Sequence, residues 1–177
     1  MTQIKYLFED INSLLGKNKL RIILISFNRA FWGVFSYRLD RSLYLIFKNS
    51  YKLIRIFLAP LFYLLQIISN CDIHHKADIK GGINIHHPSL GIVISGKSKI
   101  GKRLILTGGN VIGVKSGSKD PSIEIGDCCN IGANACIIGP LKLGNNLKIA
   151  AMACVVKNYC EDNLTLLGVP ARKFFHD

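Results

Sequence analysis

Four histidines stand close together in the middle of the chain, in two adjacent pairs at His74–His75 and His86–His87. Histidine exchanges its proton near neutral pH, so such a cluster favours acid–base chemistry or metal binding. The six cysteines form no CxxC pair and no metal-finger spacing, and the histidines lack the spacing of a zinc site. We therefore expect a general base in this segment and no metal.

The first 70 residues of the chain are both basic and apolar. The whole chain carries a formal net charge of +12, and residues 1–70 hold ten Lys or Arg against three acids, interleaved with long apolar runs. This mixture suits peripheral contact with an anionic membrane surface, and it equally suits a packed helical region with a solvated basic face. We expect no nucleic-acid partner, because no helix-turn-helix, RNA-recognition or zinc-finger pattern accompanies the charge.

Residues 1–70 are predicted to be helical. Their apolar residues recur three and four positions apart, as in Leu20, Ile23, Leu24 and Phe27. The longest charge-free run, from Ile56 to Cys71, is shorter than the roughly 20 apolar residues that cross a bilayer. The start of the chain carries acids where a signal peptide needs an apolar core, so we expect a cytoplasmic protein with reduced thiols.

Residues 71–177 follow a six-residue repeat. Aliphatic anchors recur every six residues within three groups: Ile73, Ile79, Ile85; Ile94, Ile100, Leu106, Ile112; and Ile125, Ile131, Ile137, Leu143, Ile149, Val155. This period fits neither a helix nor a plain strand, but it fits short strands joined by corners that glycine would adopt at no steric cost. Two longer steps, 85 to 94 and 112 to 125, predict protruding loops, where functional sites are often placed.

The segment from Cys71 to Phe174 resembles the hexapeptide-repeat acyltransferases, in particular the serine acetyltransferase branch and its polysaccharide-modifying relatives of the colanic acid type. The residues that carry the resemblance are Asp72-Ile73-His74, His86-His87-Pro88, Ile131-Gly132-Ala133-Asn134-Ala135 and Gly168-Val169-Pro170-Ala171-Arg172. The resemblance implies a mainly β fold: a left-handed parallel β-helix over 71–177, with a C-terminal tail, after a helical region over 1–70. It also implies a homotrimer with active sites between neighbouring subunits.

The same resemblance implies roles for individual residues. The family's catalytic histidine follows an aspartate by 15 residues, which is the interval from Asp72 to His87. His87 would then be the base and Asp72 its orienting partner, although one extra residue before Gly91 leaves His86 as an alternative base. Acetyl-CoA would be the co-substrate, and the residues expected to bind it are Gly113, Ala133, Ala151, Lys157 and Arg172.

One loop of the sequence bears on the acceptor of the acetyl group. Serine acetyltransferases carry an Asp-Arg-His-Pro loop where this chain has Ser118-Lys119-Asp120-Pro121. Loss of the arginine and histidine favours a sugar hydroxyl as acceptor, on a surface polysaccharide or a lipid-linked saccharide precursor at the inner membrane face. Serine O-acetylation is the alternative interpretation, and a non-catalytic β-helix scaffold is a second one.

Overall fold

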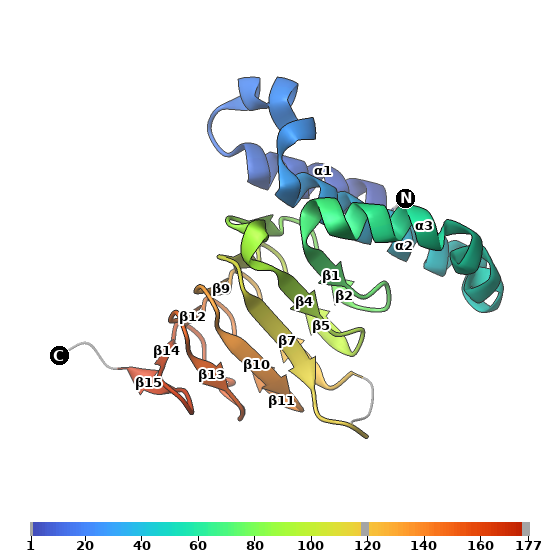
Figure 1. Ribbon diagram of the computed structural model, residues 1–177. Coiled ribbons are helices and arrows are strands. Elements are labelled where there is room, and N and C mark those ends of the chain that lie inside the picture. The colour runs from blue at the N-terminus through green and yellow to red at the C-terminus, as the bar shows by residue number, and fades with distance from the viewer. Residues whose placement is uncertain (1, 118–120, 175–177) are drawn as a thin grey trace.

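The computed structural model describes residues 2–117 and 121–174 and shows a helical cap on one end of a three-sided parallel solenoid (Figure 1). The cap comprises α1 (Thr2–Leu15), the 3-10 segment η1 (Lys19–Phe27), α2 (Arg29–Phe47), the short η2 (Lys48–Ser50) and α3 (Tyr51–Ser69). The Asn28 side chain accepts a hydrogen bond from the Ala30 N–H at 2.9 Å and so caps the start of α2. β1 begins at Cys71, directly after α3.

The solenoid makes about four turns, and each turn contributes one short strand to each of three sheets. Sheet A contains β1 (Cys71–Ile73), β4 (Ile92–Ile94), β7 (Asn110–Val114), β10 (Cys136–Gly139) and β13 (Cys154–Val155). Sheet B contains β2 (Asp78–Ile79), β5 (Ser98–Ile100), β8 (Ile123–Ile125) and β11 (Leu141–Leu143). Sheet C contains β3 (Asn84–Ile85), β6 (Ile105–Leu106), β9 (Asn130–Ile131), β12 (Lys148–Ile149), β14 (Thr165–Leu167) and β15 (Arg172–Phe174), the last of which pairs antiparallel.

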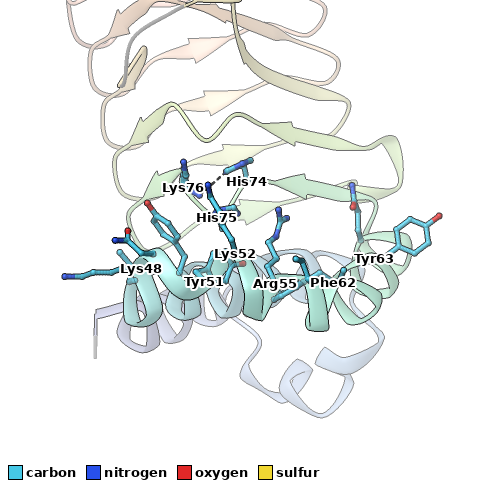
Figure 2. A pocket seen from close by; sticks show the side chains of 15 residues that line it. Lys48, Tyr51, Lys52, Arg55, Phe62, Tyr63, His74, His75 and Lys76 are labelled. Carbon is cyan, nitrogen blue, oxygen red and sulfur yellow. Dashed lines mark hydrogen bonds between the residues drawn. The ribbon is translucent and has the colours of Figure 1, made fainter.

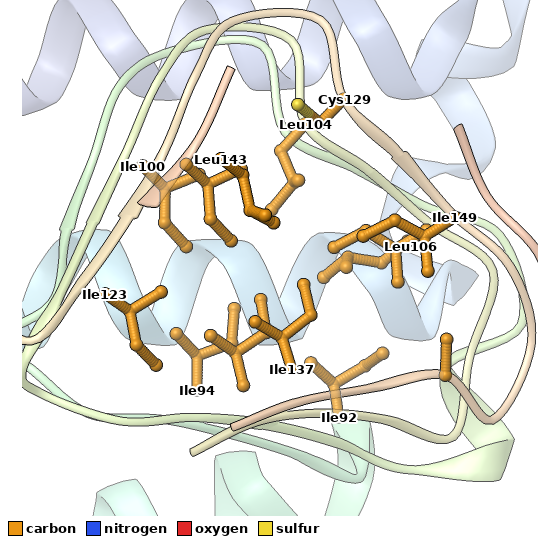
Figure 3. Close-up of a cluster of buried hydrophobic side chains, with 14 of the residues drawn as sticks. Ile92, Ile94, Ile100, Leu104, Leu106, Ile123, Cys129, Ile137, Leu143 and Ile149 are labelled. Carbon is orange, nitrogen blue, oxygen red and sulfur yellow. The ribbon is translucent and has the colours of Figure 1, made fainter. Parts of the chain in front are cut away.

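The core of the solenoid is the column of aliphatic anchors. Every six-residue anchor is buried, and so are the second inward positions such as Ala77, Leu104 and Leu147. Figure 3 shows these side chains converging from the three sides of the coil. Because neighbouring coils pair in register, each anchor rests on the anchor one turn below it, as Ile94 does on Ile112.

The glycines that follow the anchors have a different role from the one expected from the sequence. Their backbone is not in the positive-φ region; a Cβ on Gly126 would lie 2.4 Å from the Gly144 carbonyl oxygen, and one on Gly132 would lie 2.5 Å from the Ala151 nitrogen. Glycine is required at these two positions because successive coils approach too closely for a side chain. The left-handed corner conformation instead falls two positions later, on Arg103, Cys128, Asn134, Asn146 and Met152.

A buried ion pair fixes the helical cap to the first coil. Asp10 of α1 and Arg38 of α2 lie 2.8 Å apart with almost no exposure. The Asp10 carboxylate also accepts hydrogen bonds from the Gly82 and Ile83 N–H groups, while Arg38 donates to the carbonyl oxygens of Ile79 and Lys80. The pair thus satisfies backbone groups of the coil that strand pairing leaves open at the end of the solenoid.

By length and composition, one helical stretch of the described chain, Arg29–Ser69, could cross a membrane. Only 17% of its most apolar window is buried within the chain, so most of that window faces outward.

Candidate active site

Many of the residues proposed for chemistry lie along one edge of the solenoid, where the chain turns from sheet C into sheet A. Four successive corners form this edge, between β3 and β4, β6 and β7, β9 and β10, and β12 and β13. The first corner carries His86 and His87, the third carries Ala133, and the fourth carries Ala151. Adjacent coils are separated by about 4.8 Å, so the histidines and the alanines occupy one continuous edge.

The histidine pair stands on the widened first corner. The backbone N–H of His86 donates to the Leu106 carbonyl oxygen at 2.9 Å, and that of His87 donates to the Thr107 carbonyl oxygen at 3.0 Å. Both side chains are exposed, and the one-turn 3-10 segment η3 (Pro88–Leu90) that follows them accounts for the longer step in the repeat. The backbone therefore holds both imidazoles at the edge without engaging either ring.

Two glycines that the sequence reasoning missed lie under this corner. Gly108 has a φ of +128°, and a Cβ placed on it would lie 2.3 Å from the His87 carbonyl oxygen. Gly109 is also in the left-handed region, and a Cβ there would lie 1.9 Å from the Asn134 side chain. Only glycine allows this coil to pass beneath His87, so Gly108 sets the position of the histidine backbone.

Asp72 lies in β1, at the edge of sheet A, and its side chain is exposed. Among the described residues, no hydrogen bond or ion pair joins Asp72 to His87. Its electrostatic neighbour is His74: burial lowers the pKa of His74 below the ordinary 6.5, and the nearby Asp72 carboxylate partly offsets that effect. The role of Asp72 as orienting partner of His87 therefore stays a prediction.

The proposed acetyl-CoA residues divide into two groups. In the first, Ala133 and Ala151 stack at the edge, where the Ala133 carbonyl oxygen accepts a hydrogen bond from the Met152 N–H at 2.9 Å. Gly113 belongs to this group only loosely, because it lies within β7 of sheet A, opposite Ile138. A Cβ on Gly113 would meet its nearest neighbours at 3.7 Å, an ordinary contact. The packing of the chain thus does not require glycine at 113, in contrast to Gly126 and Gly132.

The second group comprises the two cations at the C-terminal end of the solenoid. Lys157 is exposed and places its ammonium 5.5 Å from the centre of the Tyr159 ring. The Tyr159 hydroxyl donates to the carbonyl oxygen of Ala171, next to the exposed Arg172 in β15. Both cations lie away from the histidines, at the other end of the solenoid.

The other histidine pair lies against the cap. His75 is buried, and its ring packs on those of Tyr44, Tyr51 and His74 at centroid distances of 4.2 to 5.0 Å. Burial lowers the pKa of His75 to about 4, so its imidazole is neutral at pH 7. In the described parts of the chain, no group of three or more His, Cys, Asp or Glu residues is arranged to hold a metal ion.

The six-residue repeat and the three-sided parallel solenoid are features that this chain shares with the hexapeptide-repeat acyltransferases. Among those proteins, the chain is similar to serine acetyltransferases. It is 32% identical to the enzyme of Mycobacterium tuberculosis over 110 residues, covering 60% of this chain and 46% of that protein. It is 31% identical to the enzyme of Haemophilus influenzae over 147 residues, covering 81% of this chain and 51% of that protein.

The structural comparison agrees. A serine acetyltransferase solved in complex with CoA superposes with a TM-score of 0.78 at 25% identity, over 98% of this chain and 70% of the other. The predicted fold class, a left-handed parallel β-helix with an N-terminal helical region, is thereby confirmed. No family model matches the chain. The chain spans about half the length of these two curated relatives.

These comparisons correct the predicted acceptor. The sugar hydroxyl of a polysaccharide or a lipid-linked saccharide was the main expectation, and it is wrong: the two sequence relatives described above and the structural neighbours are serine acetyltransferases. The expectation rested on the loop Ser118-Lys119-Asp120-Pro121, of which residues 118–120 lie outside the described residues. A missing motif in a loop of variable length is weak evidence, because recognition groups can come from other segments.

Proposed function

We propose that the chain is an acetyl-CoA-dependent serine O-acetyltransferase in which His87 is the general base. The proposal rests on the edge where the chain turns from sheet C into sheet A. There the exposed imidazole of His87 stands in line with corners that carry the small residues Ala133 and Ala151. An extended thioester arm can lie along such an edge and donate or accept hydrogen bonds with the backbone. The serine acetyltransferase relatives and the CoA complex support the choice of acceptor and donor.

In the proposed reaction, the imidazole of His87 takes the proton of the serine hydroxyl while the hydroxyl oxygen attacks the thioester carbonyl. The new C–O bond forms, the C–S bond breaks, and the imidazolium returns its proton to the departing CoA thiolate. Asp72 would stabilise the transient imidazolium by its negative charge. Gly113, Ala133 and Ala151 would allow close approach of the pantetheine arm, and Lys157 and Arg172 would pair with CoA phosphates.

A homotrimer in the cytoplasm completes the proposal. His86 and His87 are exposed on the edge of a single chain, whereas acyl transfer needs a site from which water is excluded. A neighbouring copy placed against this edge would supply the second wall of a cleft. The proposed reaction does not require the expected contact of residues 1–70 with a membrane.

The test is the rate of CoA release from acetyl-CoA in the presence of L-serine, measured for the wild type, His87→Ala and His86→Ala. We expect His87→Ala to abolish serine-dependent release and His86→Ala to retain most of it; His86→Ala is the matched control, because it removes an exposed imidazole from the same corner. Loss only in His86→Ala would assign the base to His86, and equal loss in both variants would contradict a unique role for His87. A folded wild type that releases no CoA would leave the non-catalytic scaffold as the better interpretation.

A further inference from the structure

The outward side of α3 is a continuous apolar face. Three of its side chains, Leu53, Ile56 and Phe57, are 66%, 68% and 84% exposed. The full face comprises Leu53, Ile56, Phe57, Pro60, Leu61, Tyr63, Leu64, Ile67 and Ile68, and it contains no charged residue. The opposite side of the helix, with Phe62 and Leu65, is buried against the rest of the cap. Such a large exposed apolar surface marks an interaction site.

A cationic hollow adjoins this face. Its volume is about 1300 Å³, and it lies between α3 and the first coil of the solenoid. Figure 2 shows Tyr51 and Arg55 of α3 directed toward His74 and His75 of the coil. Four cations line the hollow: Lys48, Lys52, Arg55 and Lys76. Ile56 and Tyr63 belong both to the lining of the hollow and to the apolar face, so the two surfaces are continuous.

Two polar groups that line the hollow make no hydrogen bond. Among the described residues, the Tyr51 hydroxyl and His75 Nδ1 are buried and have no hydrogen-bond partner. Tyr51 and His75 are each more than nine-tenths buried and line the hollow. Burying a polar group without a hydrogen bond costs free energy. A ligand whose oxygen atoms, directly or through water, bond to these two groups would therefore bind more tightly.

From these observations, we propose that the apolar face of α3 and the adjoining cationic hollow form a docking site for an anionic phospholipid membrane. The apolar side chains enter the boundary of the acyl chains, and the cations of the hollow meet lipid phosphates. α3 lies in the plane of the surface and does not cross the bilayer, because its buried side stays packed on the cap and Lys52 and Arg55 occupy its first two turns.

The charges of the cap favour a lipid surface over a second copy of the chain. Residues 1–70 hold only three acids: Glu9, Asp10 and Asp40. Asp10 is buried in its pair with Arg38, and Asp40 is buried near Arg55 and His75. A second cap laid on this face would therefore bring cations against cations with hardly any free carboxylate to compensate, whereas anionic lipids supply the missing negative charge.

The experiment is co-sedimentation of the full chain with vesicles of phosphatidylcholine alone and with vesicles containing phosphatidylglycerol. We expect binding only to the anionic vesicles, weakening as salt rises. Lys52→Gln should weaken binding about fivefold, as one lost cation near the surface predicts. Phe57→Asp should weaken vesicle binding at least about tenfold, whereas Phe57→Leu, which keeps the position apolar, should bind nearly as the wild type does. Lys148→Gln, which removes an exposed cation on sheet C, is the matched control and should bind as the wild type does.

Several outcomes would overturn the docking site. Equal binding to neutral and anionic vesicles, or binding to neither, would contradict it. Full competition by millimolar inorganic phosphate would assign the hollow to a free anion. An oligomer that Phe57→Asp dissociates in light scattering, without vesicle binding by the wild type, would assign the face to a second copy. The proposal does not depend on the acetyltransferase activity: Phe57→Asp should release CoA from acetyl-CoA with soluble serine at the wild-type rate.

Discussion

The ion pair between α1 and α2 offers a sharp test of how the cap is held on the solenoid. In Asp10→Ala, Arg38 keeps its bonds to Gln3 and to two carbonyl oxygens but loses the carboxylate that balances its charge. The N–H groups of Gly82 and Ile83 lose their acceptor as well. Removing one partner of a buried pair costs about 3–5 kcal/mol, so we expect the free energy of unfolding to fall by that amount.

The measurement is urea unfolding at pH 7, followed by far-ultraviolet circular dichroism. Glu124→Ala is the control, because it breaks the exposed pair with Lys142 and should cost less than about 1 kcal/mol. Replacing both partners, as in Asp10→Leu with Arg38→Met, should recover only part of the loss: no charge is then left buried, but the N–H groups of Gly82 and Ile83 still lack an acceptor. If Asp10→Ala costs no more than Glu124→Ala, the pair does not hold the cap, and our account of the first coil fails.

Three further predictions concern the edge and the hollow. Gly108→Ala should cost about 1–3 kcal/mol in urea unfolding and lower CoA release about a hundredfold, because its Cβ would displace the backbone of His87; a wild-type rate would contradict this. Gly113→Ala should raise the free energy of unfolding by about 0.4–1 kcal/mol yet raise the KM for acetyl-CoA, and an unchanged KM would exclude Gly113 from the donor site. The third concerns pH. Burial lowers the pKa of His75 to about 4, so this residue makes the folded state less stable as pH drops from 6.5. Burial raises the pKa of Asp40 to about 6, so this residue makes the folded state more stable as pH drops from 6 toward 3.8. Between pH 6 and 4, Asp40→Asn should therefore lose stability more steeply than the wild type as pH falls, whereas His75→Gln should gain stability. Urea unfolding at several pH values measures both, and the same pH dependence in both variants would contradict the prediction.

The solenoid was predictable because its energetics repeat with its sequence. Each side of a coil buries one aliphatic anchor, so the six-residue spacing of Ile131, Ile137 and Leu143 marks the three sides of one turn. Residues 18 positions apart accordingly pair, as Cys136 does with Cys154. The handedness was not contained in this pattern and came only from the resemblance, because burial at a six-residue period is the same for either hand.

The contacts that position the site were harder to predict. Asp10 and Arg38 are separated by 28 residues and look like any two charges on amphipathic helices. Nothing local indicates that both are buried. Gly108 could have been found: β3 and β6 pair with an offset of 21 residues, so a glycine 21 positions after His87 must lie beneath it. The inference requires that this coil be longer than the regular 18 residues. The long step from Ile85 to Ile94 in the repeat already implied that extra length.

The exposed edge explains why a single chain reveals only part of the proposed active site. His87 is fixed by its backbone, while its ring meets no partner among the described residues. A base in bulk water gains little from a carboxylate such as Asp72, because solvent screens the charge; the same carboxylate acts strongly once the cleft is dry. The surface that closes over the edge must therefore supply the desolvation that this chain lacks.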